Sequence, residues 1–225
     1  MELKKFYNAI RNDIQLTEAN ISGFDKVLEY LENRGETLHK AAYIIATAFW
    51  ETGRTMQPVK EAFWLSEDWR KKNLRYFPYY GRGYVQLTWD YNYKKASDYF
   101  KIDFVKNPDL VMNPQYALPI LVVGMKEGWF TGKKLDDYID DVDEDDKEDL
   151  REYTNARRIV NGTDKQVEIG KLALLFEKAL KAANYGVKAT EKPTEVIVED
   201  PKVELPTDTN SIVELIMKLL RMLLK

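Results

Sequence analysis

The sequence predicts a mostly helical protein, with one folded domain followed by a tail. Apolar residues recur at helical spacing through most of the first 185 positions, whereas only residues 81–89 alternate as a short strand or hairpin does. The composition changes after Tyr185, where a stretch rich in Pro, Thr and charged residues begins. A chain of 225 residues is long enough for one sizeable core.

Helical periodicity marks six segments, and they are residues 3–14, 23–33, 37–50, 90–100, 114–127 and 164–184. The third, TLHKAAYIIATAFW, is strongly apolar and is expected to be buried, with Thr37 as its N-cap. The sixth has an apolar stripe at Val167, Ile169, Leu172, Leu174, Leu175 and Leu180. Residues 51–78 have mixed periodicity and are expected to form loops.

A dense acidic run, LDDYIDDVDEDDKED, occupies residues 135–149. A solvated helix face or loop is the simplest interpretation. A calcium-binding loop is the alternative, although the run lacks the glycine that an EF-hand needs at its turn.

The bulk composition excludes several classes of function. A net charge of -3 argues against a nucleic-acid partner, and the absence of cysteine excludes disulfides and Cys-based metal sites. A single histidine, His39, argues against a histidine metal cluster or a Ser-His-Asp triad. No cofactor is implied, and an enzyme of this composition would depend on carboxylates. The N-terminus lacks the apolar core of a secretory signal, so we expect synthesis in the cytoplasm.

The tail divides into two parts. Residues 186–210 contain Pro193, Pro201 and Pro206 among Thr, Glu and Lys, and predict a semi-extended linker. Residues 211–225, SIVELIMKLLRMLLK, predict a helix of roughly 22 Å, which is too short for a bilayer core of about 30 Å. Its wide apolar face, Ile212–Leu224, suits contact with an anionic membrane, self-association or docking on its own catalytic domain.

The stretch YYGRGYVQLTWDYNY, residues 79–93, suggests a sugar-binding cleft. Aromatic rings stack on the apolar faces of sugars, and neutral amides and hydroxyls bind sugar hydroxyl and N-acetyl groups. Ten aromatic residues fall close together: Trp64, Trp69, Tyr76, Phe77, Tyr79, Tyr80, Tyr84, Trp89, Tyr91 and Tyr93. Many of them would serve equally well in a core. We assign Tyr80 and Trp89 to the cleft, beside the polar Gln86, Thr88 and Asn92.

Sugar-cleaving sites usually need one protonated and one ionised carboxyl group. Glu51 ends the apolar helix beside Trp50, where partial desolvation favours its protonated form. Glu61 lies ten residues later, on a segment that can fold back toward it. Glu67 and Asp68 compete with Glu61 for the second role.

Three separated motifs resemble family 19 glycoside hydrolases, the chitinase-like family. They are AFWETG at 48–53, which contains Glu51, the stretch 79–93, and ARRIVNG at 156–162. NPDL (107–110) and GMKEGWFTGKKL (124–135) resemble the bacteriophage endolysin branch in particular. The resemblance runs from about residue 5 to 184 and implies a lysozyme-like, two-lobed helical domain over residues 1–185, with a groove and a small β element.

The resemblance also assigns roles to individual residues. It makes Glu51 the general acid, Glu61 the general base and Thr88 the hydroxyl that helps to hold the attacking water. Sugar-contacting positions fall on Gln86, Tyr91, Asn92 and Asn161. Trp50 replaces the family's histidine, Arg82 is expected to brace the cleft, and Arg157 or Arg158 is expected to pair with a catalytic carboxylate.

The family inverts anomeric configuration, which implies two carboxyl groups roughly 6.5–9.5 Å apart with a water between them. The short connection between Glu51 and Glu61 suits an open cleft, and therefore branched peptidoglycan rather than chitin. The resulting hypothesis is a phage lysin made in the host bacterial cytoplasm and released to the cell wall through holin-made holes. The alternatives are a chitinase and a non-catalytic cell-wall-binding virion protein.

Overall fold

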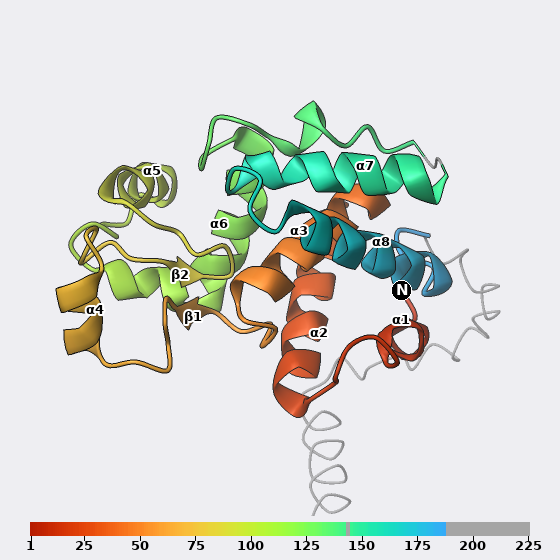
Figure 1. The fold of residues 1–225 in the computed structure, drawn as a ribbon, viewed down its shortest axis with the longest axis horizontal. Helices are drawn as coiled ribbons and strands as arrows, with labels where there is room; N and C mark the ends of the chain where they lie inside the picture. The colour runs from red at the N-terminus through yellow and green to blue at the C-terminus, as the bar shows by residue number, and fades with distance from the viewer. Residues whose placement is uncertain (143–144, 188–225) are drawn as a thin grey trace, which may run out of the picture. The chain divides into compact units, whose positions relative to one another are not determined.

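A computed structural model describes residues 1–142 and 145–187, and this part of the chain is mainly helical (Figure 1). The predicted linker beyond residue 187 and the predicted C-terminal helix at 211–225 lie outside the described residues. Within the described ranges, no helix has the combined length and apolarity that crossing a bilayer requires.

The regular elements of the described ranges comprise α-helices, short 3-10 helices and a two-stranded sheet. The α-helices are α1 (Leu3–Ile10), α2 (Glu18–Asn33), α3 (Leu38–Glu51), α4 (Glu67–Asn73), α5 (Asp90–Phe100), α6 (Pro114–Glu127), α7 (Asp146–Ala156) and α8 (Gln166–Ala182). The 3-10 helices are η1 (Pro108–Met112), η2 (Leu135–Asp137) and η3 (Arg157–Ile159), and the strands are β1 (Val59–Lys60) and β2 (Arg82–Gly83). The predicted fold class, mainly helical with a small β element, is confirmed.

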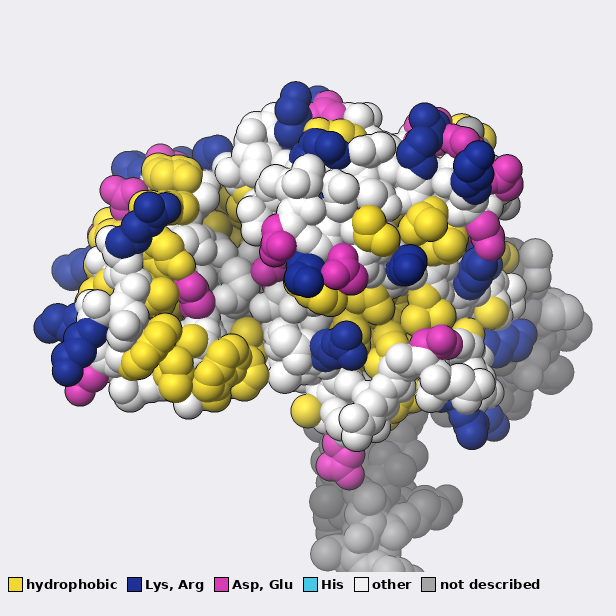
Figure 2. Space-filling model, viewed as in Figure 1, with side chains coloured by type: hydrophobic (Ala, Val, Ile, Leu, Met, Phe, Trp, Pro, Cys, Tyr) yellow, Lys and Arg dark blue, Asp and Glu magenta, His cyan; other side chains and the backbone are white. Residues whose placement is uncertain are grey.

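The helices form two lobes (Figure 1). In the larger lobe α8 packs against α1, α3 and α7. The smaller lobe, on the left of the view, contains α4, α5 and the sheet, and α6 contacts both α3 and η1. The surface is hollowed between the two lobes on the face shown in Figure 2.

Helix α3 is the centre of the larger lobe. Its residues from Ala41 to Phe49 are all buried, as the apolar sequence predicts. Phe49 stacks on Phe24 with ring centroids 5.7 Å apart and meets Phe176 edge to face at 5.8 Å. Burial of such rings contributes most to core stability, so the end of α3 is firmly anchored just before Glu51.

The turn that follows α3 is held close to α2. Gly23 of α2 lies so near the chain that a Cβ there would come within 1.9 Å of the Met56 carbonyl oxygen. Only a glycine permits this approach. The contact fixes the beginning of the connection between the two lobes.

The sheet is smaller than the predicted hairpin. β1 pairs antiparallel with β2 through Val59 opposite Gly83 and Lys60 opposite Arg82, and Arg82 also bridges to Leu87. The predicted strand at 81–89 therefore contributes a two-residue ladder and a tight turn. The pairing places the segment after β1 beside the aromatic stretch.

Several expected boundaries differ from the structure. α2 begins five residues before the predicted start, because Thr17 and Asn20 form a reciprocal capping box. The predicted loop region 51–78 contains α4, which Ser66 caps. Thr37 occupies the N-cap position of α3, but its hydroxyl donates to Asp141 instead of capping the helix.

Most described acidic side chains of the run are exposed, as a solvated loop or helix face requires, but its end is packed. Asp145 caps α7 by accepting from the backbone N–H groups of Lys147 and Glu148. Asp149 lies on the inner face of that helix and is 2% exposed. The run therefore ends in a packed helix.

Candidate active site

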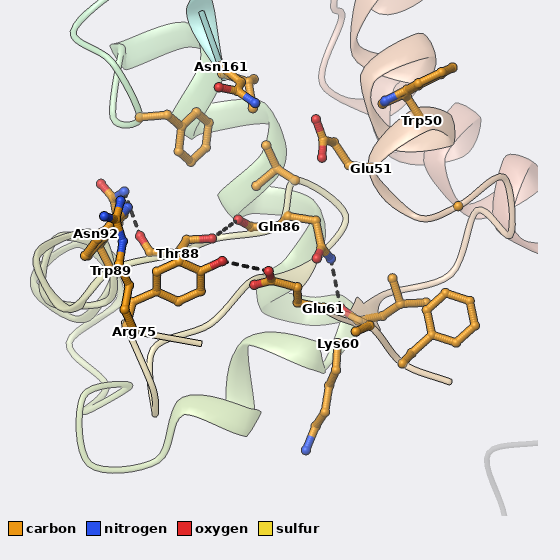
Figure 3. A pocket seen from close by; sticks show the side chains of 18 of the residues that line it. Trp50, Glu51, Lys60, Glu61, Arg75, Gln86, Thr88, Trp89, Asn92 and Asn161 are labelled. Carbon is orange, nitrogen blue, oxygen red and sulfur yellow. Dashed lines mark hydrogen bonds between the residues drawn. The ribbon is translucent and has the colours of Figure 1, made fainter. Parts of the chain in front are cut away.

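A cavity with a volume of about 660 Å³ lies between the two lobes (Figure 3). Its lining comes from the end of α3, the segment around β1, the aromatic stretch and the chain after η3. The lining residues are Trp50, Glu51, Gly53, Val59, Lys60, Glu61, Ala62, Phe63, Trp64, Arg75, Tyr76, Val85, Gln86, Thr88, Trp89, Tyr91, Asn92, Phe130, Val160 and Asn161.

Glu51 is the last residue of α3 and lines this cavity. Its side chain is 15% exposed. The guanidinium of Arg157 donates to Glu51 Oε1 over 2.5 Å, and Arg157 also donates to the Asp164 carbonyl. The structure thus identifies Arg157, rather than Arg158, as the arginine that pairs with a candidate catalytic carboxylate.

Two opposing effects act on the pKa of Glu51. Burial raises this pKa and is the larger effect, while the Arg157 guanidinium lowers it, so the net direction is upward. Because Arg157 contacts Oε1, Oε2 is the oxygen that can carry a proton. A carboxyl group whose pKa is raised in this way is suited to act as a proton donor.

Glu61 lies on the other side of the cavity, immediately after β1 (Figure 3). Its carboxylate accepts from the Tyr76 hydroxyl over 2.7 Å and from the Gly81 backbone N–H over 3.0 Å. Arg70 donates to the Glu61 backbone carbonyl. An ionised carboxylate only accepts hydrogen bonds, so this set of donors both fits and orients it.

The polar residues of the aromatic stretch lie beside Glu61. The Thr88 hydroxyl donates to the Gln86 carbonyl over 2.7 Å, which leaves its oxygen able to accept a further bond. Asn92 donates to the Thr88 carbonyl over 2.9 Å, and its own Oδ1 is buried without a partner among the described residues. Asn92 itself is among the residues that line the cavity.

The backbone of this stretch is itself unusual. Gln86 and Trp89 have φ values of 53° and 74°, in the left-handed region that non-glycine residues rarely adopt. The Trp89 N–H is held by the Tyr79 carbonyl over 2.8 Å. Such conformations cluster at binding sites, where surrounding contacts hold them.

The structure brings most of the predicted site residues together. Those that line the cavity are Glu51, Glu61, Gln86, Thr88, Trp89, Tyr91, Asn92 and Asn161. Tyr80 does not: it is fully buried and its hydroxyl donates to Glu67. The assignment of Tyr80 to the cleft was wrong because its ring packs on the Arg82 guanidinium, 3.6 Å from the ring centroid.

Arg82 braces the smaller lobe, as expected. It donates to a carboxylate oxygen of Asp109 over 2.8 Å, to the Pro78 carbonyl over 2.9 Å and to the Tyr93 hydroxyl over 2.9 Å. Asp109 belongs to the NPDL fragment and also pairs with Lys60. The Gly-Arg-Gly turn is thereby tied to both β1 and η1.

Sequence reasoning missed several lining residues. Phe63 and Trp64 are 46% and 72% exposed beside Glu61, and the Arg75 guanidinium lies 5.2 Å from the Trp89 ring centroid. Trp64 belonged to the aromatic cluster, but nothing in its spacing distinguished a cavity ring from a core ring. Tyr76 had the same ambiguity, which only its contact with Glu61 removes.

Comparisons with known proteins give independent information on the part of the chain that contains most of the cavity lining. Residues 39–124 match the family model Glyco_hydro_19, described as chitinase class I. Chitinase 11 of Oryza sativa subsp. japonica is 62% identical over 34 residues, which are 15% of this chain and 13% of that protein. Inactive chitinase-like protein 1 of Hevea brasiliensis is 52% identical over 33 residues, which are 15% of this chain and 10% of that protein.

Among solved structures, chitinase C from Streptomyces griseus HUT6037 is similar, with a TM-score of 0.48 and 20% identity. That match covers 80% of this chain and 75% of the solved chain. The curated relatives, by contrast, are matched over only a small part of their own length.

The family match covers residues 39–124 and is to the chitinase class I model of the glycoside hydrolases. The matched segment, which resembles family 19, contains both Glu51 and Glu61. The resemblance to family 19 is thus confirmed. The bacteriophage endolysin branch stays a prediction.

Proposed function

We propose that this chain hydrolyses β-1,4 glycosidic bonds of an N-acetylhexosamine polymer with inversion of configuration. The observation that carries the proposal is that Glu51 and Glu61 lie on opposite sides of one cavity in different environments (Figure 3). Glu51 is desolvated, which raises its pKa, whereas Glu61 is surrounded by hydrogen-bond donors. Inverting glycosidases require this division between an acid and a base.

In the proposed reaction, Glu51 Oε2 gives its proton to the glycosidic oxygen, and the bond from that oxygen to the anomeric carbon breaks. Positive charge develops on the sugar ring. A water held by Thr88 attacks the opposite face of the anomeric carbon, and Glu61 takes the proton that this water loses. Asn92 and Asn161 supply amide groups on the cavity surface for the N-acetyl and hydroxyl substituents.

The pairing of Glu51 with Arg157 predicts a shift in the pH profile. In an Arg157→Gln variant the guanidinium no longer lowers the pKa of Glu51, so that pKa rises further. The acid then stays protonated to higher pH, and the alkaline limb of kcat/KM should move to higher pH. Arg158→Gln is the matched control, since Arg158 bonds to Asn155 instead. A limb that moves to lower pH, or equally in both variants, would contradict this assignment.

We propose peptidoglycan rather than chitin as the substrate. Residues 52–60 alone connect Glu51 to Glu61, which leaves little chain to cover the cavity between the lobes. The exposed Phe63, Trp64 and Tyr91 provide open stacking surfaces at its edge. Peptidoglycan carries a lactyl-peptide branch on alternate sugars, and an open cavity tolerates such a branch. On this proposal the protein is a phage lysin that acts on the host cell wall.

The experiment compares two substrates under identical conditions. Purified Gram-negative sacculi and N-acetylglucosamine oligomers are incubated with the full chain, and new reducing ends and their initial anomeric form are measured. Release from sacculi with inverted anomers is the expected result. Release from the oligomers alone, with intact sacculi, would overturn the peptidoglycan assignment and leave a chitinase.

A non-catalytic sugar-binding protein is the alternative from another class. The similar protein from Hevea brasiliensis is named an inactive chitinase-like protein, so local similarity alone does not establish catalysis. Binding of oligomers or sacculi with no new reducing ends from either would establish this alternative. The placement of Glu51, Glu61 and Thr88 on one cavity argues against it.

A further inference from the structure

A second group of polar side chains lies inside the larger lobe, among residues that do not line the cavity. His39 of α3, Asp149 of α7 and Glu177 of α8 are 7%, 2% and 1% exposed. One nitrogen or oxygen atom from each lies within 4.8 Å of the others. Three helices therefore direct three potential metal ligands to one buried point.

One ring nitrogen of His39 lacks a hydrogen-bond partner among the described residues. This atom is Nε2, and it is buried. Buried polar atoms without partners are uncommon because their desolvation is uncompensated. A neutral imidazole nitrogen in this situation is suited to bind a cation.

The surroundings of Glu177 hold its carboxylate in place. The Tyr153 hydroxyl donates to Oε2 over 2.8 Å, and the Lys181 ammonium donates to Oε1 over 2.6 Å. Metal ligands are usually oriented by hydrogen bonds of this kind from neighbouring groups. A divalent cation would be attracted to the two buried carboxylates of Asp149 and Glu177.

We propose that His39, Asp149 and Glu177 bind a divalent transition-metal ion, of the chemical class of Zn²⁺. One imidazole nitrogen with two carboxylate oxygens suits zinc, whereas calcium and magnesium prefer oxygen ligands alone. Zinc binding would require the three atoms to come to metal–ligand distances of about 2.0–2.2 Å. The chain contains a single histidine, so the site depends entirely on His39.

The ion would act on structure rather than in the reaction. α3 begins next to His39 and ends at Glu51, and α7 leads from Asp149 directly into η3, which begins with Arg157. A metal that joins α3, α7 and α8 therefore fixes the elements that bring Arg157 to Glu51. It would stabilise the larger lobe without touching the substrate.

The test uses the full chain after removal of metal by a chelator. Titration with Zn²⁺ is expected to bind one ion per chain and to raise the unfolding temperature by about 5–10 °C at a hundredfold excess over Kd. Mg²⁺ should give no such shift. The imidazole NMR signals of the one histidine report directly whether its nitrogen binds the ion.

Variants locate the site. His39→Ala and Asp149→Asn should lose stoichiometric zinc, while Asp146→Asn should keep it, because Asp146 lies on the exposed face of α7 beside Lys178. The wild-type titration decides the matter even if a core variant does not fold. No stoichiometric zinc in the wild type, zinc that survives His39→Ala, or an imidazole signal that responds only to pH would each overturn the proposal.

Discussion

Glu51→Gln is expected to lower kcat on natural glycan by about a hundred- to ten-thousandfold, with little change in KM. Glutamine has nearly the same shape and keeps an oxygen for the Arg157 guanidinium, but it has no acidic proton to give. In the wild type, burial raises the pKa of Glu51 and favours its protonated form. The amide of the variant cannot supply that proton. The measurement is steady-state hydrolysis of soluble oligomers and of sacculi.

A substrate with an acidic leaving group distinguishes an acid from a merely structural residue. The dinitrophenolate of a dinitrophenyl glycoside leaves without being protonated. Glu51→Gln should therefore recover most of its rate on that substrate. Glu18→Gln, an exposed glutamate at the start of α2, serves as the control for the substitution itself. An equal loss on both substrates would show that Glu51 is not the general acid.

Glu61→Gln is expected to cause a loss of similar size, about a hundred- to ten-thousandfold, on both kinds of substrate. The amide cannot remove a proton from the attacking water, and no leaving group compensates for that. A small anionic nucleophile such as azide should partly restore product formation in this variant, because azide needs no base. It should not restore Glu51→Gln on natural substrate.

Glu67→Gln is the matched control for Glu61, since Glu67 was its competitor in sequence. The Glu67 carboxylate accepts from Tyr80 and Arg70 and is not among the residues that line the cavity. This variant should keep most of its rate. If Glu67→Gln were as impaired as Glu61→Gln, or if Glu61→Gln stayed active, the base would lie elsewhere.

Local signals explain which elements could be predicted from sequence. α6 matches its predicted range because Asn113 caps it, Pro114 occupies its first position and Gly128 ends it in the left-handed conformation. α7 was not predicted as a packed helix, because its sequence is rich in acidic residues and only three of its residues are buried. Its inward face depends on tertiary contacts of Tyr153 and Asp149, which periodicity does not show.

The candidate site could likewise be predicted from the sequence only in part. The motifs placed Glu51 and Glu61 in order along the chain, but Arg157 and Arg158 are neighbours in sequence, and only the fold distinguishes them. His39, Asp149 and Glu177 lie on three different helices and share no motif. Their association follows from helix packing alone.

The two sides of the cavity differ in how freely they could change. Glu51 stands at the end of a helix whose preceding turns are wholly enclosed, so substitutions there would disturb the whole lobe. Phe63, Trp64 and Tyr91 line the same cavity, and about half or more of each residue is exposed to solvent. Variation in sugar preference, whether by natural divergence or by laboratory selection, should therefore accumulate on the aromatic side while the acid-bearing helix stays constant.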